Sequence, residues 1–262
     1  MYRSFLSDMF ALVVENIHTT LHIAGAWVAI SIGLNVAQTM TSFSPLGTLF
    51  MVANLICSLL AAGSIATAWH RFGLLNERPE TFQLRFGRLE LKVLGRILLA
   101  ALVSAPAMAL AFVPLVFLVL IINAIPIGNI SGLLIFFALF ACVLFYLYFY
   151  FRVCFIVPAA AVGHNVGIRK SYLISENYFF PALLSGLSLQ VPALISLGFF
   201  ALLLHGFVGA STLAGQILLT IGFALLQIFS MSVTLAAVTV AYRRAIEALW
   251  AENPNDPVFA RQ

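Results

Sequence analysis

The five histidines are the side chains of this chain best suited to chemistry. His18 and His22 are four residues apart, so on a helix they share a face and could form half of a metal or haem site. His70 and His164 belong to other segments, and only the fold decides whether the four converge. Because no further ligand with metal-site spacing accompanies them, we predict hydrogen-bonding roles, with no bound metal and no cofactor.

Other signatures of catalysis are absent from the sequence, which contains no P-loop, GxSxG or HExxH motif. Its three cysteines lie singly in apolar stretches, without the paired spacing of a disulfide framework or a zinc site. We therefore predict that the protein is not an enzyme. An intramembrane enzyme would require two or more of the following residues to meet in one pocket: His18, His22, His70, His164 and Glu77.

Basic residues are concentrated between positions 78 and 96. On a continuous helix over 79–96, with about 100° per residue, five basic side chains project within an arc of roughly 80°. They are Arg78, Arg85, Arg88, Lys92 and Arg96. Each contributes about 1 kcal/mol near an anionic leaflet, so this stripe is the predicted lipid- or partner-binding site. The same stripe also suits a simpler role, as an anchor that orients the chain in its membrane.

The elements that carry these residues follow from composition. Of the 262 residues, 63% are hydrophobic and 8% are charged, whereas soluble domains have about 25% charged residues. A membrane span needs about 20 apolar residues. Six stretches qualify, at approximately 21–40, 46–69, 97–122, 132–151, 180–206 and 217–242, and none contains Asp, Glu, Lys or Arg. The sequence predicts an all-α, polytopic membrane protein with a single transmembrane domain over residues 1–262.

The charged residues also predict an orientation. All thirteen Lys and Arg lie in segments of the same parity, and the positive-inside rule makes that face cytoplasmic. Both termini are then cytoplasmic, and the six spans form three helical hairpins. An interfacial amphipathic helix precedes each hairpin, at about 2–17, 79–96 and 166–177. The apolar run 153–163 is too short to cross a bilayer, so we expect it at the interface or in a shallow fold-back.

The position of the basic residues also predicts which partners the protein has. Basic residues beside spans are explained by orientation and by anionic headgroups, so we expect membrane lipids as partners and no nucleic acid.

The second, fourth and sixth spans each end in an aromatic residue followed closely by Arg. This recurrence fits an internal repeat of three hairpins, and it equally fits the ordinary cytoplasmic end of a span, where aromatic rings and Arg meet headgroups.

Five amide side chains interrupt the spans: Asn35, Gln38, Asn54, Gln190 and Gln227. Polar groups in spans face the bundle interior, where they cross-link helices by hydrogen bonds or line a path for a solute. The spans contain no carboxylate, which disfavours an ion-coupled carrier, because proton and sodium pathways commonly depend on such groups.

One segment carries a recognisable pattern. Arg152 closes a span, a short apolar run with Pro158 follows, and after Gly167 a small helix ending in Ser175 leads to the next span. The pattern resembles the uncharacterised bacterial inner-membrane proteins of the YciC-like family and the membrane region of some bacterial glycerophosphodiester phosphodiesterases. The resemblance implies a bacterial inner membrane and supplies no established activity. Because no soluble catalytic domain follows the spans in this sequence, we do not expect phosphodiesterase activity.

The sequence therefore favours a non-catalytic integral membrane protein. Its expected role is that of an accessory, assembly or stabilising partner of a larger membrane complex, or of a lipid-organising factor. The alternative is a transporter or channel for a small neutral or lipid-like solute, with the five amide side chains along its route.

Overall fold

The computed structural model describes residues 2–41, 44–79, 83–124, 130–207 and 212–252, and over these ranges the chain is helical, with no strand. Six helices are long and apolar enough to cross a membrane. They are α2 (Ile17–Met40), α3 (Pro45–Leu75), α4 (Arg88–Ala124), α5 (Ile130–Val153), α8 (Phe179–Phe207) and α9 (Leu213–Glu252). The prediction of six apolar spans is confirmed, since each predicted span lies within one of these helices.

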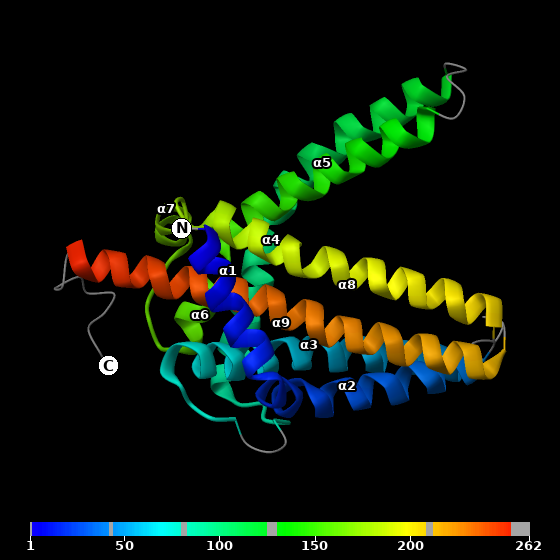
Figure 1. Cartoon of the computed structure of the whole chain (residues 1–262), viewed down its shortest axis with the longest axis horizontal. Helices are drawn as coiled ribbons and strands as arrows, with labels where there is room; N and C mark the ends of the chain where they lie inside the picture. The colour runs from blue at the N-terminus through cyan, green and yellow to red at the C-terminus, as the bar shows by residue number, and fades with distance from the viewer. Residues whose placement is uncertain (1, 42–43, 80–82, 125–129, 208–211, 253–262) are drawn as a thin grey trace.

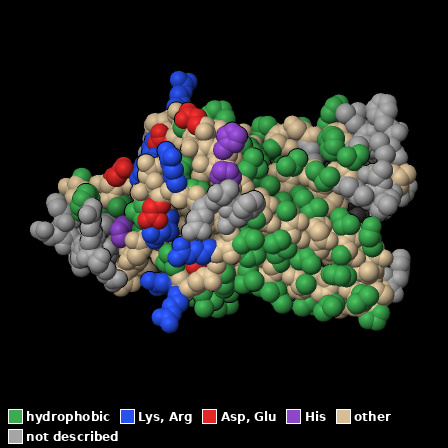
Figure 2. All heavy atoms as spheres, turned by 90° about the horizontal axis from the view of Figure 1, so that it is seen from below, with side chains coloured by type: hydrophobic (Ala, Val, Ile, Leu, Met, Phe, Trp, Pro, Cys, Tyr) green, Lys and Arg blue, Asp and Glu red, His purple; other side chains and the backbone are tan. Residues whose placement is uncertain are grey.

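The spans are arranged with one end much more tightly connected than the other. α2 packs along α3, α4 along α5, and α8 along α9, while the α4–α5 pair diverges from the remaining four (Figure 1). α1 (Tyr2–Phe10) and the C-terminal end of α9 lie at the same end of the molecule (Figure 1). On the face drawn in Figure 2, the Lys, Arg, Asp and Glu side chains gather at that end, and the rest of the described face is largely apolar.

The N-terminal segment packs on the bundle. α1 and the π-helical stretch η1 (Ala11–Glu15) contact α9, and α1 also contacts α8. Phe5, Met9 and Val13 recur at every fourth position and are buried there. The same segment also has exposed apolar side chains, Tyr2 and Phe10. The predicted helix over 2–17 is thus present in two pieces, and its buried stripe contacts protein.

An ion pair fastens this segment to the end of α9. The Arg244 Nη2 lies 2.6 Å from Asp8 Oδ2, and Arg244 Nη1 donates to Ser4 Oγ at 3.2 Å. The same guanidinium lies 5.3 Å from the centre of the Phe5 ring. Arg244 of α9 therefore contacts both polar and aromatic side chains of α1.

The apolar run after α5 is packed inside the helical bundle. Eleven consecutive residues, 151–161, are buried, and they include all of α6 (Ile156–Ala161). α6 packs between α3, α4 and α9. Neighbouring helices cover this run, so its apolar side chains contact protein. Its place at the interface or in a shallow fold-back stays a prediction. Its composition alone could not distinguish contact with lipid from contact with protein.

The prediction of one continuous helix over 79–96 is wrong. Residues 80–82 lie outside the described chain, residues 83–86 are not helical, and residues 88–96 form the first turns of the spanning helix α4. The amide of Gly87 donates to the Glu90 carboxylate at 2.7 Å, which satisfies one donor at the helix start. The third predicted interfacial helix, 166–177, is present as the shorter α7 (Ile168–Ile174).

Gly63 sets how closely α3 and α4 approach. A Cβ at this position would lie 2.9 Å from the Glu90 carbonyl oxygen and 3.0 Å from Leu94 Cβ, whereas a Cβ at Gly25 in α2 would meet nothing within 4 Å. We expect Gly63→Ala to destabilise the protein by about 1–3 kcal/mol through overpacking. Gly25→Ala is the matched control, and should be neutral or stabilising by up to about 1 kcal/mol. Thermal unfolding in mild detergent measures both, and equal midpoints would contradict the close contact.

The buried stripe of α1 gives a second prediction. Replacing Phe5 and Met9 together by Ala should cost several kcal/mol, because each removes a fully buried side chain, at about 2–5 kcal/mol apiece. The control replaces the exposed Tyr2 and Phe10 of the same helix by Ala and should cost far less. Limited proteolysis of the N-terminal segment and thermal unfolding report the difference. Equal protease sensitivity of the two double variants would show that α1 is not docked as described.

Candidate functional site

The site begins at the end of α3, where the chain reverses. Asn76 adopts a left-handed conformation (φ 56°, ψ 28°), and its amide donates to the Phe72 carbonyl at 3.0 Å. Asn is one of the few residues that adopt this conformation at a helix end at low cost. The reversal brings Glu77 back over the last turn of α3, against Arg71.

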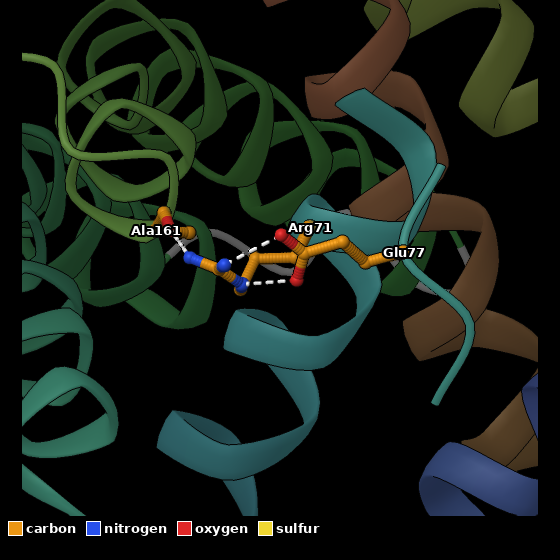
Figure 3. A network of polar contacts seen from close by, with 3 residues as sticks. All are labelled: Arg71, Glu77 and Ala161. Atoms are coloured by element: carbon orange, nitrogen blue, oxygen red, sulfur yellow. Dashed lines mark hydrogen bonds and ion pairs between the residues drawn. The ribbon is translucent and has the colours of Figure 1, made fainter. Parts of the chain in front are cut away.

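Arg71 joins three parts of the fold (Figure 3). Its Nε and Nη2 donate to the two carboxylate oxygens of Glu77 at 2.7 and 2.6 Å. Its Nη1 donates to the Ala161 carbonyl at the end of α6 at 3.1 Å. A planar guanidinium suits this arrangement, because its donors lie in a rigid fork that matches a carboxylate.

Beside Arg71 lies a polar cavity of about 430 Å³ between α3, the segment that follows it and the start of α4. Four arginines and two carboxylates are among the residues that line it: Arg71, Arg78, Arg85, Arg88, Glu77 and Glu90. Glu77 is bound to Arg71, and Glu90 accepts the Gly87 amide. The described lining therefore carries an excess of positive charge, and it can bind phosphate or carboxylate oxygens.

The segment that carries Arg85 is anchored to two spans. The Trp27 indole Nε1 of α2 donates to the Gln83 carbonyl at 2.8 Å, and Ser64 Oγ of α3 donates to the same carbonyl at 3.4 Å. Gln83 itself is buried. These bonds hold the non-helical segment against the bundle, so Arg85 and Arg88 remain near the end of α3.

The predicted stripe is split by this geometry. Arg78, Arg85 and Arg88 line the cavity, whereas Lys92 and Arg96 lie on later turns of α4 and are not among its described lining residues. The prediction that the five basic side chains project within an 80° arc requires one helix that carries all five. In the structure α4 begins only at Arg88. Arg71 is the site residue that sequence reasoning missed. Its place depends on the left-handed turn at Asn76, for which the residue type is the only local signal.

The histidines do not converge. His18 and His22 are exposed on α2. His70 is fully buried, and its Nδ1 lies 2.8 Å from Thr239 Oγ1. His164 Nδ1 lies 2.8 Å from the Tyr242 hydroxyl. In the described part of the chain, no three His, Cys, Asp or Glu side chains are grouped as a metal site requires.

A buried cation, Arg152, connects α5 to α7. Arg152 is 5% exposed, and its guanidinium carbon lies 4.1 Å from the centre of the Tyr172 ring, close enough for a cation–π contact. The Ser171 and Ser175 hydroxyls each donate to the Arg152 carbonyl at 3.1 Å, and Ser171 also contacts the Val153 carbonyl at 2.8 Å. The two serine hydroxyls thus donate hydrogen bonds to backbone carbonyls at the end of α5, where helical partners run out.

The five amide residues of the proposed solute route fall into separate places. Asn35 and Gln227 line a cavity of about 250 Å³ between α2 and α9, and Asn54 donates to Asn35 Oδ1 at 3.3 Å. Gln190 instead donates to Thr234 Oγ1 at 2.9 Å, between α8 and α9. Gln190 also lines a different cavity, of about 90 Å³, between α5, α8 and α9. The bonds favour cross-linking of helices.

Comparison of the chain with protein-family models, with curated proteins and with solved structures found no match. The resemblance to YciC-like proteins thus stays a prediction.

Burial affects the titration of His164. The pKa of this half-buried ring is lowered from its ordinary value of 6.5, because burial penalises the charged form. As pH falls through 6.5, the unfolded chain therefore takes up the proton before the native chain, and stability is lost. We expect His164→Gln to reduce the fall in unfolding midpoint between about pH 7.5 and pH 5.5. His18→Gln, which changes an exposed histidine, is the control and should retain the wild-type slope.

Proposed function

We propose that this protein is a non-catalytic, multi-pass membrane protein that binds anionic lipid headgroups at its charged end. In this role it organises lipid, or acts as an accessory, assembly or stabilising partner of a larger membrane complex. The observation that carries the proposal is the arginine-lined cavity of about 430 Å³ beside the end of α3 and the start of α4. Arginine forks match the oxygens of a phosphate group in both charge and geometry.

The position of this cavity supports a headgroup as the ligand. It lies where two spanning helices end, among the charged side chains that gather at one end of the visible face (Figure 2). Anionic headgroups occupy this depth of a bilayer, and each nearby basic residue contributes about 1 kcal/mol to their attraction. A soluble anion would have no reason to require such a location.

We further propose a topology of three hairpins, with both termini cytoplasmic, in the inner membrane of a bacterium. The same-parity placement of Lys and Arg supports the orientation through the positive-inside rule. The sequence pattern around Arg152 supports the bacterial inner membrane. In this topology the arginine-lined cavity faces the cytoplasmic leaflet, which in many membranes carries negative surface charge.

A transporter or channel for a small neutral or lipid-like solute is the alternative. The cavity between α2 and α9, lined by Asn35 and Gln227, is the observation in its favour. Gln190 lies apart from it, against Thr234, so this alternative has less support than headgroup binding.

Two paired substitutions test headgroup binding. Arg78→Gln with Arg88→Gln removes two charges that line the cavity, while Lys92→Gln with Arg96→Gln removes two charges from the following turns of α4. Both pairs lower the net charge equally. We expect the first pair to weaken binding of phosphatidylglycerol by on the order of tenfold, at about 1 kcal/mol per charge, and the second pair to have a much smaller effect.

The measurement is native mass spectrometry of purified protein with phosphatidylglycerol in a phosphatidylcholine background. Equal losses for the two pairs would mean that general surface charge, and not the cavity, attracts the lipid. Purification in nanodiscs without detergent then separates the two roles. A stoichiometric protein partner indicates an accessory subunit, and enrichment of anionic lipid alone indicates lipid organisation.

A further inference from the structure

His70 has a hydrogen-bonding arrangement that leaves one ring nitrogen without a partner. The Thr239 hydroxyl donates to the Leu235 carbonyl at 2.6 Å, so its only hydrogen is used. Thr239 Oγ1 must therefore accept the hydrogen bond from His70, which lies 2.8 Å away. His70 Nδ1 is then the protonated nitrogen, and in a neutral ring Nε2 carries a lone pair.

The ring is neutral because nothing compensates a charge there. His70 is 0% exposed, and no hydrogen bond or ion pair joins it to a carboxylate in the described part of the chain. An unpaired charge is very costly to bury. Nε2 is therefore a buried acceptor, and it has no hydrogen-bond partner in the structure. Most buried polar atoms of proteins do have one, so this atom requires an explanation.

His70 lines a cavity of about 290 Å³ between α3, α4, α5, α6 and α9. Its described lining is mainly apolar and carries no formal charge. Two lining groups that could have served His70 are already used: Cys154 Sγ donates to the Phe151 carbonyl at 3.2 Å, and the Thr234 hydroxyl donates to the Ser230 carbonyl at 2.9 Å. Tyr150, which carries a hydroxyl, also lines the cavity. The cavity thus combines an apolar body with a small polar part, to which His70 and Tyr150 contribute.

The cavity lies between helices that are long and apolar enough to cross a membrane. α4 and α5 contribute to its lining, and this pair diverges from the other spans (Figure 1). We expect a molecule dissolved in the bilayer to enter between the spanning helices that line the cavity. Within the described residues, the arginines of the headgroup cavity do not line it. The two sites are therefore distinct, although His70 and Arg71 are consecutive residues of α3.

We propose that this cavity binds a membrane-dissolved molecule that has a hydroxyl group on an apolar body, with the hydroxyl donating to His70 Nε2. A metal ion does not fit, because no group of three ligating side chains occurs among the described residues. An anion does not fit, because the described lining has no cation. A cavity of this size holds a ring or a short chain, at the lower end of the range for small-molecule sites.

The test compares para-hexylphenol with its methyl ether para-hexylanisole, in which a methyl group replaces the hydrogen that the hydroxyl would donate. Protein in phosphatidylcholine nanodiscs is titrated with each probe, and ¹⁵N NMR of labelled histidine follows the Nε2 resonance of His70. We expect the phenol to bind about tenfold more tightly than the ether and to shift the Nε2 resonance. Equal affinities in the wild-type protein, or an Nε2 resonance that does not move, would overturn the proposal.

Two variants test whether the preference for the phenol over the ether depends on His70. His70→Leu keeps an apolar side chain and removes the acceptor, so both probes should bind with equal affinity. Thr239→Val removes the group that fixes the tautomer while retaining its shape, so the preference for the phenol should fall severalfold. His164→Gln is the control and should retain the full preference. A preference that survives in a folded His70→Leu or Thr239→Val protein would overturn the assignment.

This outcome is independent of headgroup binding. Arg78→Gln with Arg88→Gln should leave the phenol preference unchanged, and His70→Leu should leave phosphatidylglycerol binding unchanged. Loss of both by either set of substitutions would mean that the two sites are not distinct, which would overturn the proposal of a separate hydroxyl site.

Discussion

An apolar interior supplies no water for unpaired backbone groups, and in this protein the constraint is most severe where the chain leaves α5 and folds back as α6. Some backbone carbonyls of this buried segment accept no hydrogen bond within a helix, and side chains of the protein donate to them instead. The hydroxyls of Ser171 and Ser175 donate to the Arg152 carbonyl, and the Arg71 guanidinium donates to the Ala161 carbonyl. A short helix inside the bundle is possible because α3 and α7 supply these partners.

Contacts made by α9 explain why one end of the molecule is tightly connected. Thr239 contacts His70, Tyr242 contacts His164, and Arg244 binds the N-terminal helix. A Cβ at Gly73 of α3 would lie only 2.6 Å from Thr239 Cγ2, so the two helices touch closely here. Farther along the spans such polar contacts are sparser among the described residues, and the α4–α5 pair separates from its neighbours (Figure 1).

This arrangement places two different environments on either side of the last turns of α3. Consecutive helical residues point about 100° apart, so Arg71 lies at the polar cavity while His70 lies in the apolar one. Charge recognition and recognition of an apolar molecule can therefore occur on one helix without mixing. The buried polar bonds around α6 and α7 keep the two surfaces apart.

The sequence by itself determined the class of the protein and the number of spans, because runs of about 20 apolar residues without charge have one stable solution in a bilayer. It also located most of the basic residues of the arginine-lined cavity, since charge cannot lie within the spans. Tertiary structure decided what surrounds each segment. The run 153–163 is apolar whether lipid or protein covers it, and His18 and His70 look alike until a neighbouring helix buries one of them. Arg71 joined the site only through the turn at Asn76, because contacts between segments depend on backbone direction, which periodicity does not encode.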